Sequence, residues 1–268
     1  MKIKRILHGS QWLLIAVILD AFVMLQLSQY SPPTAETFYL MVFSLAGPIN
    51  DVNTLLLIEW FMVYLIFFFA VCNSFLEDFQ INYLYIFPRI GTKRKWLHQQ
   101  TLYLLLKTAV FWALLFCIAF LYTQFFSFAK AQNAIFYIEL YIGLLLSSFC
   151  IVFLENVLSL QLGAALSFII GSSVFLLSIL IGMFLYDSNP LNGWLFSMMP
   201  TLASLLQWHS DSYIIKSVKD GYFSYPPLNG FTLLKSWGIS FLYLIVMHQY
   251  LYRMIEKKDS MNFVKGEK

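Results

Sequence analysis

Apolar runs long enough to cross a lipid bilayer recur along nearly the whole chain. A bilayer core requires about 20 apolar residues in helical conformation, and six segments approach or exceed this length. They are Trp12–Leu27, Leu55–Phe75, Leu102–Phe125, Ile135–Leu154, Leu160–Leu185 and Phe231–Leu251. Charged residues make up only 12% of the chain, against about 25% in a soluble globular domain. The sequence therefore predicts an all-α, polytopic membrane protein with six transmembrane helices in a single domain, residues 1–268.

The distribution of cations predicts how these helices are oriented. Lys and Arg beside the ends of spanning helices stay in the cytoplasm. If successive spans cross the membrane in alternating directions, most of the 17 Lys and Arg lie in or beside connections on the same side of the membrane. The exceptions are Lys130, Lys216, Lys219 and Lys235. We therefore expect both termini in the cytoplasm. A very short connection between the fourth and fifth spans, marked by Glu155 and Asn156, is expected on the same side.

Three segments outside the six spans are expected to lie at the membrane surface or to enter it part of the way. Residues 1–10 separate basic from apolar side chains, which fits either an interfacial helix on the cytoplasmic side or a plain positive anchor. Phe38–Leu45 is apolar but too short to span, so we expect a surface or re-entrant segment. Residues 186–230 form the longest polar connection, on the external side. Pro200 interrupts an apolar stretch there and predicts one or two short re-entrant helices between the fifth and sixth spans.

The connection between the second and third spans, residues 76–100, contains the most distinctive stretch of the chain, INYLYIFPRIGTKRKW at Ile81–Trp96. Its four cations fix the cytoplasmic side, and topology alone would explain them. Topology does not require the aromatic and polar side chains that accompany these cations. Because short amphipathic elements with aromatic side chains dock on soluble partners, we interpret this region as a cytoplasmic coupling loop. From side-chain type, the expected contact residues are Glu77, Asp78, Tyr83, Tyr85, Arg89 and Arg94.

The run Arg-Ile-Gly-Thr-Lys-Arg-Lys-Trp at residues 89–96, followed at once by a spanning helix, resembles the permease subunits of ABC-2-type ABC transporters. The likeness is greatest to small bacterial permeases of peptide, lantibiotic and bacteriocin export or immunity systems. It implies a multi-pass protein of the bacterial cell membrane with a cytoplasmic coupling helix between the second and third spans and a re-entrant element between the fifth and sixth. It also implies two permeases, identical or paired with a sister subunit, assembled with two ATP-binding cassette ATPase subunits.

Motifs for catalysis or cofactor binding are absent from the sequence. There is no G-x-x-x-x-G-K-[ST] run for nucleotide phosphates, and no H-E-x-x-H or C-x-x-C. We therefore predict no enzyme activity, no catalytic residue and no metal site in this chain. The resemblance implies that ATP and Mg²⁺ bind to the partner ATPase. Cations at the membrane edges indicate lipid head groups and not nucleic acid.

Two carboxylates within the apolar segments are candidates for a substrate path. Asp20 lies near the middle of the first span, where a charge is costly and usually faces a cavity or the bundle interior; a hydrogen-bonded packing contact explains it equally well. Glu59 lies in the outer part of the second span.

Two functions are consistent with these features. The resemblance implies a permease subunit that couples ATP hydrolysis by a separate ATPase to export of an amphipathic or antimicrobial peptide, or of a lipid-like substrate. The alternative is a stand-alone membrane immunity or sensor protein that binds a peptide or lipid without ATP-driven transport.

Overall fold

The computed structural model describes residues 10–29, 32, 34–44, 54–80, 93–126, 128, 134–188, 193–213 and 226–257. Within these residues the named elements are all helical. They are α2 (Ser10–Ser28), α3 (Ala35–Phe43), α4 (Thr54–Val71), α6 (Lys93–Phe125), α7 (Ala134–Leu162), α8 (Ala164–Ser188), α9 (Gly193–Ser197), η1 (Pro200–Ser204), η2 (Leu206–Trp208) and α11 (Leu233–Lys257). Residues 74–80 form one further helical segment shortly after α4 ends.

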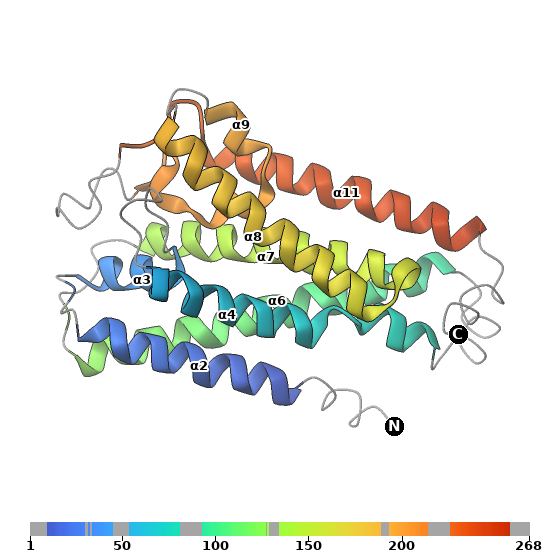
Figure 1. Ribbon diagram of the computed structural model, residues 1–268, viewed down its shortest axis with the longest axis horizontal. Helices are drawn as coiled ribbons and strands as arrows, with labels where there is room; N and C mark the ends of the chain where they lie inside the picture. Colours follow the sequence, from blue (N-terminus) through green and yellow to red (C-terminus); the bar gives the residue numbers. More distant parts are fainter. Residues whose placement is uncertain are drawn as a thin grey trace.

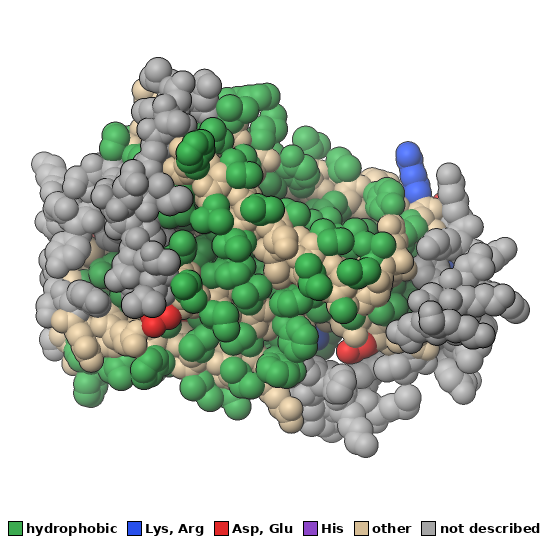
Figure 2. All heavy atoms as spheres, in the orientation of Figure 1, with side chains coloured by type: hydrophobic (Ala, Val, Ile, Leu, Met, Phe, Trp, Pro, Cys, Tyr) green, Lys and Arg blue, Asp and Glu red, His purple; other side chains and the backbone are tan. Residues whose placement is uncertain are grey.

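Five of these segments are long and apolar enough to cross a membrane. They are Gln11–Ser28, Leu57–Gln80, Lys93–Phe125, Ala134–Leu162 and Ala164–Tyr186. Large apolar side chains are exposed along their outer faces, and Figure 2 shows hydrophobic side chains spread over the described part of one face. Soluble proteins rarely expose a continuous apolar surface of this extent. The prediction of an all-α, polytopic membrane protein is confirmed at this level.

The sixth expected span, Phe231–Leu251, corresponds to α11. Its 25 residues give a length of about 37 Å at the helical rise, which is enough for a bilayer core. It is less apolar than the other five because polar residues such as Lys235 and His248 interrupt it. Ile245 and Val246 nevertheless leave more than half of their surface exposed.

α7 is the central helix of the bundle. In Figure 1, α6, α4 and α2 lie below it, α11 lies above it, and α8 lies in front. A larger share of α7 is buried than of the other four candidate spans. It is followed by Gly163 at φ +83°, a left-handed conformation that glycine adopts without a Cβ clash. The predicted connection at Glu155 and Asn156 is wrong, because α7 continues through both residues and buries them.

The bundle has two ends of different construction (Figure 1). At one end α6 begins with Lys93, Arg94 and Lys95, and α11 finishes with Arg253 in its last turns. Residues 74–80 and the α7–α8 turn also lie there, and we call this the basic end. At the other end, called here the opposite end, lie α3 and α9 (Figure 1), together with η1, which contacts α7, α8 and α11, and η2, which contacts α7.

Short helical elements fill the opposite end. The sequence predicts one or two short helices around Pro200, and the structure has three short elements there, with Pro200 in the first turn of η1. Gly143 of α7 allows η1 to approach closely, because a Cβ at this position would lie 2.5 Å from the carbonyl oxygen of Ala203. The segment expected at the surface or re-entrant, Phe38–Leu45, forms most of α3, and its aromatic side chains are buried.

Ser44, directly after α3, satisfies backbone groups of this irregular region. Its hydroxyl donates to the carbonyl oxygen of Ser204 at 3.1 Å and accepts from the N–H of Leu206 at 3.3 Å. Non-helical backbone is tolerated at membrane depth only where protein or water supplies such partners. The short elements are therefore integrated into the bundle and are not a loop laid over it.

Candidate functional site

Asn156 joins α7 to the break between α4 and residues 74–80. Its side-chain oxygen accepts from the N–H of Phe75 at 2.9 Å, and its side-chain nitrogen donates to the carbonyl oxygens of Val71 and Val152, each at 2.9 Å. The end of one helix and the start of the next leave backbone groups without intrahelical partners. A buried amide that carries both a donor and an acceptor can satisfy both sides of the break. This explains why a polar side chain lies inside an apolar helix.

Asp78 joins the same segment to α6. Its Oδ2 accepts from the indole N–H of Trp96 at 2.7 Å and from the side-chain amide of Gln100 at 2.6 Å. Hydrogen bonds to a carboxylate are shorter and stronger than bonds between neutral groups. Beside it, Glu77 accepts from the amide of Asn73 at 3.2 Å. Residues 74–80 are therefore attached to two long helices at once.

The structure describes three of the six residues expected in the coupling loop. Asp78 is buried and positions its own segment, Glu77 lies one residue earlier, and Arg94 lies in the first turn of α6 with its guanidinium 5.9 Å from the centre of the Tyr252 ring. The other three, Tyr83, Tyr85 and Arg89, lie outside the described residues. At both of its described ends the predicted loop 76–100 is helical, since residues 76–80 and 93–100 belong to helices.

Asp20 and Glu59, the candidate substrate-path residues, lie on neighbouring helices. Asp20 is on α2 and only 4% exposed, whereas Glu59 is half-buried on α4, which packs against α2. With the Gln26 amide assigned so that its nitrogen faces Glu59, this nitrogen lies 3.0 and 3.3 Å from the two carboxylate oxygens. Gln26 follows Asp20 by six residues on α2, about 9 Å along the helix. The two carboxylates thus share one helix pair but lie at different depths.

The surroundings of Asp20 combine polar atoms with large aromatic rings. Asp20 Oδ2 and the hydroxyl of Tyr64 are buried, close enough to influence each other electrostatically, and neither has a hydrogen-bond partner in the described part of the chain. The Tyr64 ring packs against Trp60, Trp112 and Phe175. A carboxyl group without a cation partner at this depth is costly when ionised. The site therefore favours either a protonated Asp20 or a cationic group delivered to it.

Glu155 is a further buried carboxyl group, which sequence reasoning assigned to a loop. It is 0% exposed on α7, and neither oxygen has a hydrogen-bond partner among the described residues. Its side chain packs against Gly171 of α8, where any Cβ would collide with it. The pairing of an acid with a glycine on the next helix could not be inferred from hydropathy, which registers only the polarity of Glu155.

Buried polar groups also mark the opposite end. His209 follows η2; its Nδ1 lies 3.1 Å from the carbonyl oxygen of Leu205, and its ring stacks on Phe231 with centroids 3.9 Å apart. Burial lowers the pKa of His209 to about 3, so its imidazole is neutral at physiological pH.

Two carboxylates accept hydrogen bonds from backbone N–H groups near His209. Glu139 of α7 accepts from the N–H of Tyr213 at 2.9 Å, and Asp211 accepts from the N–H of Leu233 at 2.8 Å, where α11 begins. Acceptors at a helix start satisfy N–H groups that lack intrahelical partners. These contacts connect the short elements to both α7 and α11.

Cysteine and metal chemistry add no site within the described residues. No group of three or more His, Cys, Asp and Glu side chains converges there in a way that could hold a metal ion. Cys72 and Cys150 are buried free thiols, and Cys117 is an exposed one.

The comparisons with known proteins give no match: no family model, no curated protein and no solved structure is detectably similar to this chain.

Proposed function

We propose that this chain is the membrane-spanning permease subunit of an ABC exporter and that its basic end couples to the ATPase. The assembly would contain two ATPase subunits, which bind ATP and Mg²⁺, and a second permease that is either another copy or a sister subunit. The cargo would be an amphipathic or antimicrobial peptide, or a lipid-like molecule. The location would be the bacterial cell membrane.

The proposed topology has six spans, with α11 as the sixth. Its length and its exposed Ile245 and Val246 support this assignment. With six spans both termini are cytoplasmic, and the positive-inside rule places Lys93, Arg94 and Lys95 in the cytoplasm. Those cations begin α6 at the basic end, so that end would face an ATPase.

The observation that carries the proposal is the attachment of the chain on either side of residues 81–92. On one side, residues 74–80 are held to α7 through Asn156 and to α6 through Asp78. On the other side the chain enters α6 directly at Lys93. A partner bound to residues 81–92 would therefore displace α4, α6 and α7 together. Such a rigid-body shift is a common way of opening or closing a path between subunits.

The α2–α4 pair supports a role for this chain in contacting cargo. Asp20 and Glu59 both lie on it, and Asp20 has no cation partner in the described residues. A cationic peptide segment would compensate this charge, as buried acids within membranes usually pair with cations or line a polar path.

The test is purification of the tagged full chain from its own membranes in a mild detergent, followed by measurement of ATP hydrolysis and identification of the ATP-binding subunit. We expect an ATPase to copurify with the wild-type chain. Arg89→Glu and Tyr85→Ala should each reduce the recovered ATPase about tenfold, the effect of losing one charged hydrogen bond or a buried aromatic contact. Lys130→Glu changes a cation expected on the external side and should leave recovery unchanged.

The proposal fails if no ATP-binding subunit copurifies, or if Lys130→Glu reduces its recovery as much as Arg89→Glu does. Binding of a peptide, or of a lipid away from the basic end, by the purified chain with no associated ATPase would favour the stand-alone immunity or sensor function.

A further inference from the structure

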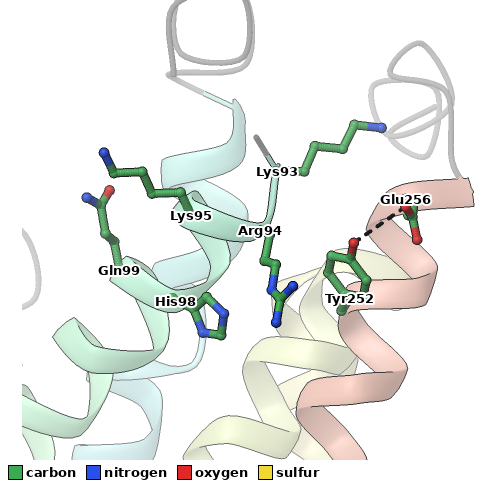
Figure 3. A pocket seen from close by; sticks show the side chains of 7 residues that line it. All are labelled: Lys93, Arg94, Lys95, His98, Gln99, Tyr252 and Glu256. Carbon is green, nitrogen blue, oxygen red and sulfur yellow. Dashed lines mark hydrogen bonds between the residues drawn. The ribbon is translucent and has the colours of Figure 1, made fainter. Parts of the chain in front are cut away.

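An open pocket at the basic end lies between the start of α6 and the end of α11. Its volume is ≈ 630 Å³, and Figure 3 shows its lining side chains. Those from α6 are Lys93, Arg94, Lys95, His98 and Gln99, and those from α11 are Tyr252 and Glu256. The pocket involves neither the Asp78 and Asn156 contacts nor the α2–α4 pair.

The pocket carries an excess of positive charge. Three of its lining side chains are Lys or Arg, and Glu256 is the one acidic side chain among them. Glu256 accepts a hydrogen bond from the Tyr252 hydroxyl at 3.4 Å, while Lys93 donates to the carbonyl oxygen of Ile255 at 3.0 Å. Arg94 has no ion pair within the described part of the chain; its guanidinium faces the Tyr252 ring. Its N–H donors therefore remain available to an anion.

The position of the pocket at the start of α6 adds to this preference. The first N–H groups of a helix lack intrahelical acceptors, and the helix dipole favours negative charge beside them. α6 begins at Lys93, so these groups lie beside the cations of the pocket. The guanidinium group of Arg matches the geometry of phosphate and carboxylate groups and binds either through paired hydrogen bonds.

The face of α6 that carries Lys95 and Gln99 points away from α11 in Figure 3 and changes from polar to apolar along the helix. Lys95 and Gln99 are followed at helical spacing by Leu102 and Leu106, which are 56% and 53% exposed. Leu106 lies about 16 Å from Lys95 along the helix axis. A free phosphate would gain nothing from contact with this apolar surface. A lipid, in contrast, can place its head group on the cations and its acyl chain along the leucines. The geometry therefore favours a lipid as the source of the phosphate.

We propose that this pocket binds the phosphate head group of an anionic membrane lipid, with Arg94, which points toward α11, as its main donor and Lys95, on the face of α6 that carries the exposed leucines, as a second (Figure 3). The site depends on the membrane placement of the bundle and not on the proposed transport function. Failure to find an ATPase would leave it standing.

The experiment measures lipid binding to the purified full chain in neutral detergent by native mass spectrometry. Phosphatidylglycerol and phosphatidylcholine with identical acyl chains are compared, because only the first has a net negative head group. We expect wild type to bind phosphatidylglycerol at least tenfold more tightly. Arg94→Gln should weaken that binding about tenfold, and Lys95→Gln about fivefold. Binding of phosphatidylcholine, whose choline cation offsets its phosphate, should change less.

Arg253→Gln is the matched control, since Arg253 lies next to Tyr252 on the same turn of α11 but does not line the pocket. It should bind phosphatidylglycerol as wild type does. Arg94→Lys, which retains the charge, should lose less affinity than Arg94→Gln. Lys95 lies on an exposed helical surface, so Lys95→Gln gives the same comparison if Arg94→Gln does not fold.

Three results would overturn the proposal. One is equal affinity for the two lipids in wild type. Another is an equal loss of phosphatidylglycerol binding in Arg94→Gln, Lys95→Gln and Arg253→Gln, which would indicate a diffuse effect of net charge. The third is competition by millimolar glycerol phosphate, which would identify a soluble phosphate as the ligand in place of a lipid.

Discussion

The two ends of the bundle are built by different means. At the opposite end, η1 rests against α7 at Gly143, and Ser44 satisfies its backbone, so short elements fill the space between long helices. At the basic end, single polar side chains, Asn156 and Asp78, attach helix ends to one another. The opposite end is filled by whole short elements, whereas at the basic end these polar contacts lie among buried rings such as Phe75, Phe79 and Trp96 and beside an open, cationic pocket.

This difference suggests that the two ends respond differently when a partner binds. A closely packed end resists displacement, because interiors packed without voids transmit strain and do not absorb it. An end whose helix ends are joined by directional hydrogen bonds and buried rings can move as a unit when a partner binds, as long as those contacts hold. The opposite end would then serve as the pivot and the basic end as the part that moves. Four predictions test this contrast.

The largest effect is expected at the packed end, from Gly143→Leu. The new side chain would collide with the backbone of Ala203, which cannot move aside as a flexible side chain can. Overpacking of this kind costs about 3 kcal/mol or more when the neighbour is rigid. Thermal unfolding in detergent should show a large loss of stability or of folded yield. Gly238→Leu is the matched control, because nothing lies within 4 Å of a Cβ at Gly238.

Asn156→Ala tests the attachment at the basic end. It removes the partners of the Phe75 N–H and the Val71 carbonyl oxygen, both buried. Leaving such groups unsatisfied costs about 2 kcal/mol in all. Asn73→Ala removes an amide from the same region that makes a single bond, to Glu77, and should cost less than half as much. Equal unfolding temperatures for the two variants would mean that the hydrogen bonds of Asn156 do not hold residues 74–80 to α7.

The sequence predicted the apolar segments well but misjudged their ends. Hydropathy finds α2, α6 and α8 because their lipid-facing surfaces are apolar. It assigned Glu155 and Asn156 to a connection because polarity within an apolar run usually marks one. The reason for the error is non-local: Asn156 meets Phe75, 81 positions earlier in the chain. No local pattern reveals that a distant helix break needs an amide.

The coupling region shows the same limitation. Its cations and aromatic residues predict a cytoplasmic connection, yet α6 begins at Lys93, nine residues before its apolar run starts. Asp78 was expected at a partner interface from its charge alone, and it is buried against Trp96. Gly163, in contrast, is a signal that local reasoning can use, since its φ of +83° suits the turn after α7.

The next prediction concerns pH and returns to the packed end. His209 has a pKa of about 3 in the fold, below the value of about 6.5 expected in the unfolded chain. Below pH 6.5 the unfolded state therefore binds a proton that the folded state does not. Stability should fall by about 1.4 kcal/mol for each pH unit between roughly 6.5 and 3 because of this group. In His209→Asn this contribution should disappear, so unfolding temperatures of wild type and variant should converge as the pH falls from 6.5 to 5. Parallel pH profiles would show that His209 does not contribute in this way.

The smallest effect is expected from Asp78→Asn, which keeps the shape of the side chain and removes its charge. Both donors reach the same oxygen, Oδ2, so an asparagine oxygen in that place can still accept from the indole N–H of Trp96 and from the amide of Gln100, but it carries no charge. Exchanging charged for neutral hydrogen bonds should cost about 1 kcal/mol. Glu77→Gln, one residue earlier, replaces a carboxylate that accepts one longer bond from Asn73 and should change stability less.

Because Asp78 attaches residues 74–80 to α6, the loss of its charge should also loosen the basic end in advance of global unfolding. Hydrogen exchange of residues 74–80 should therefore increase in Asp78→Asn while exchange in η1 stays unchanged, and a uniform increase at both ends would remove the distinction between pivot and moving part.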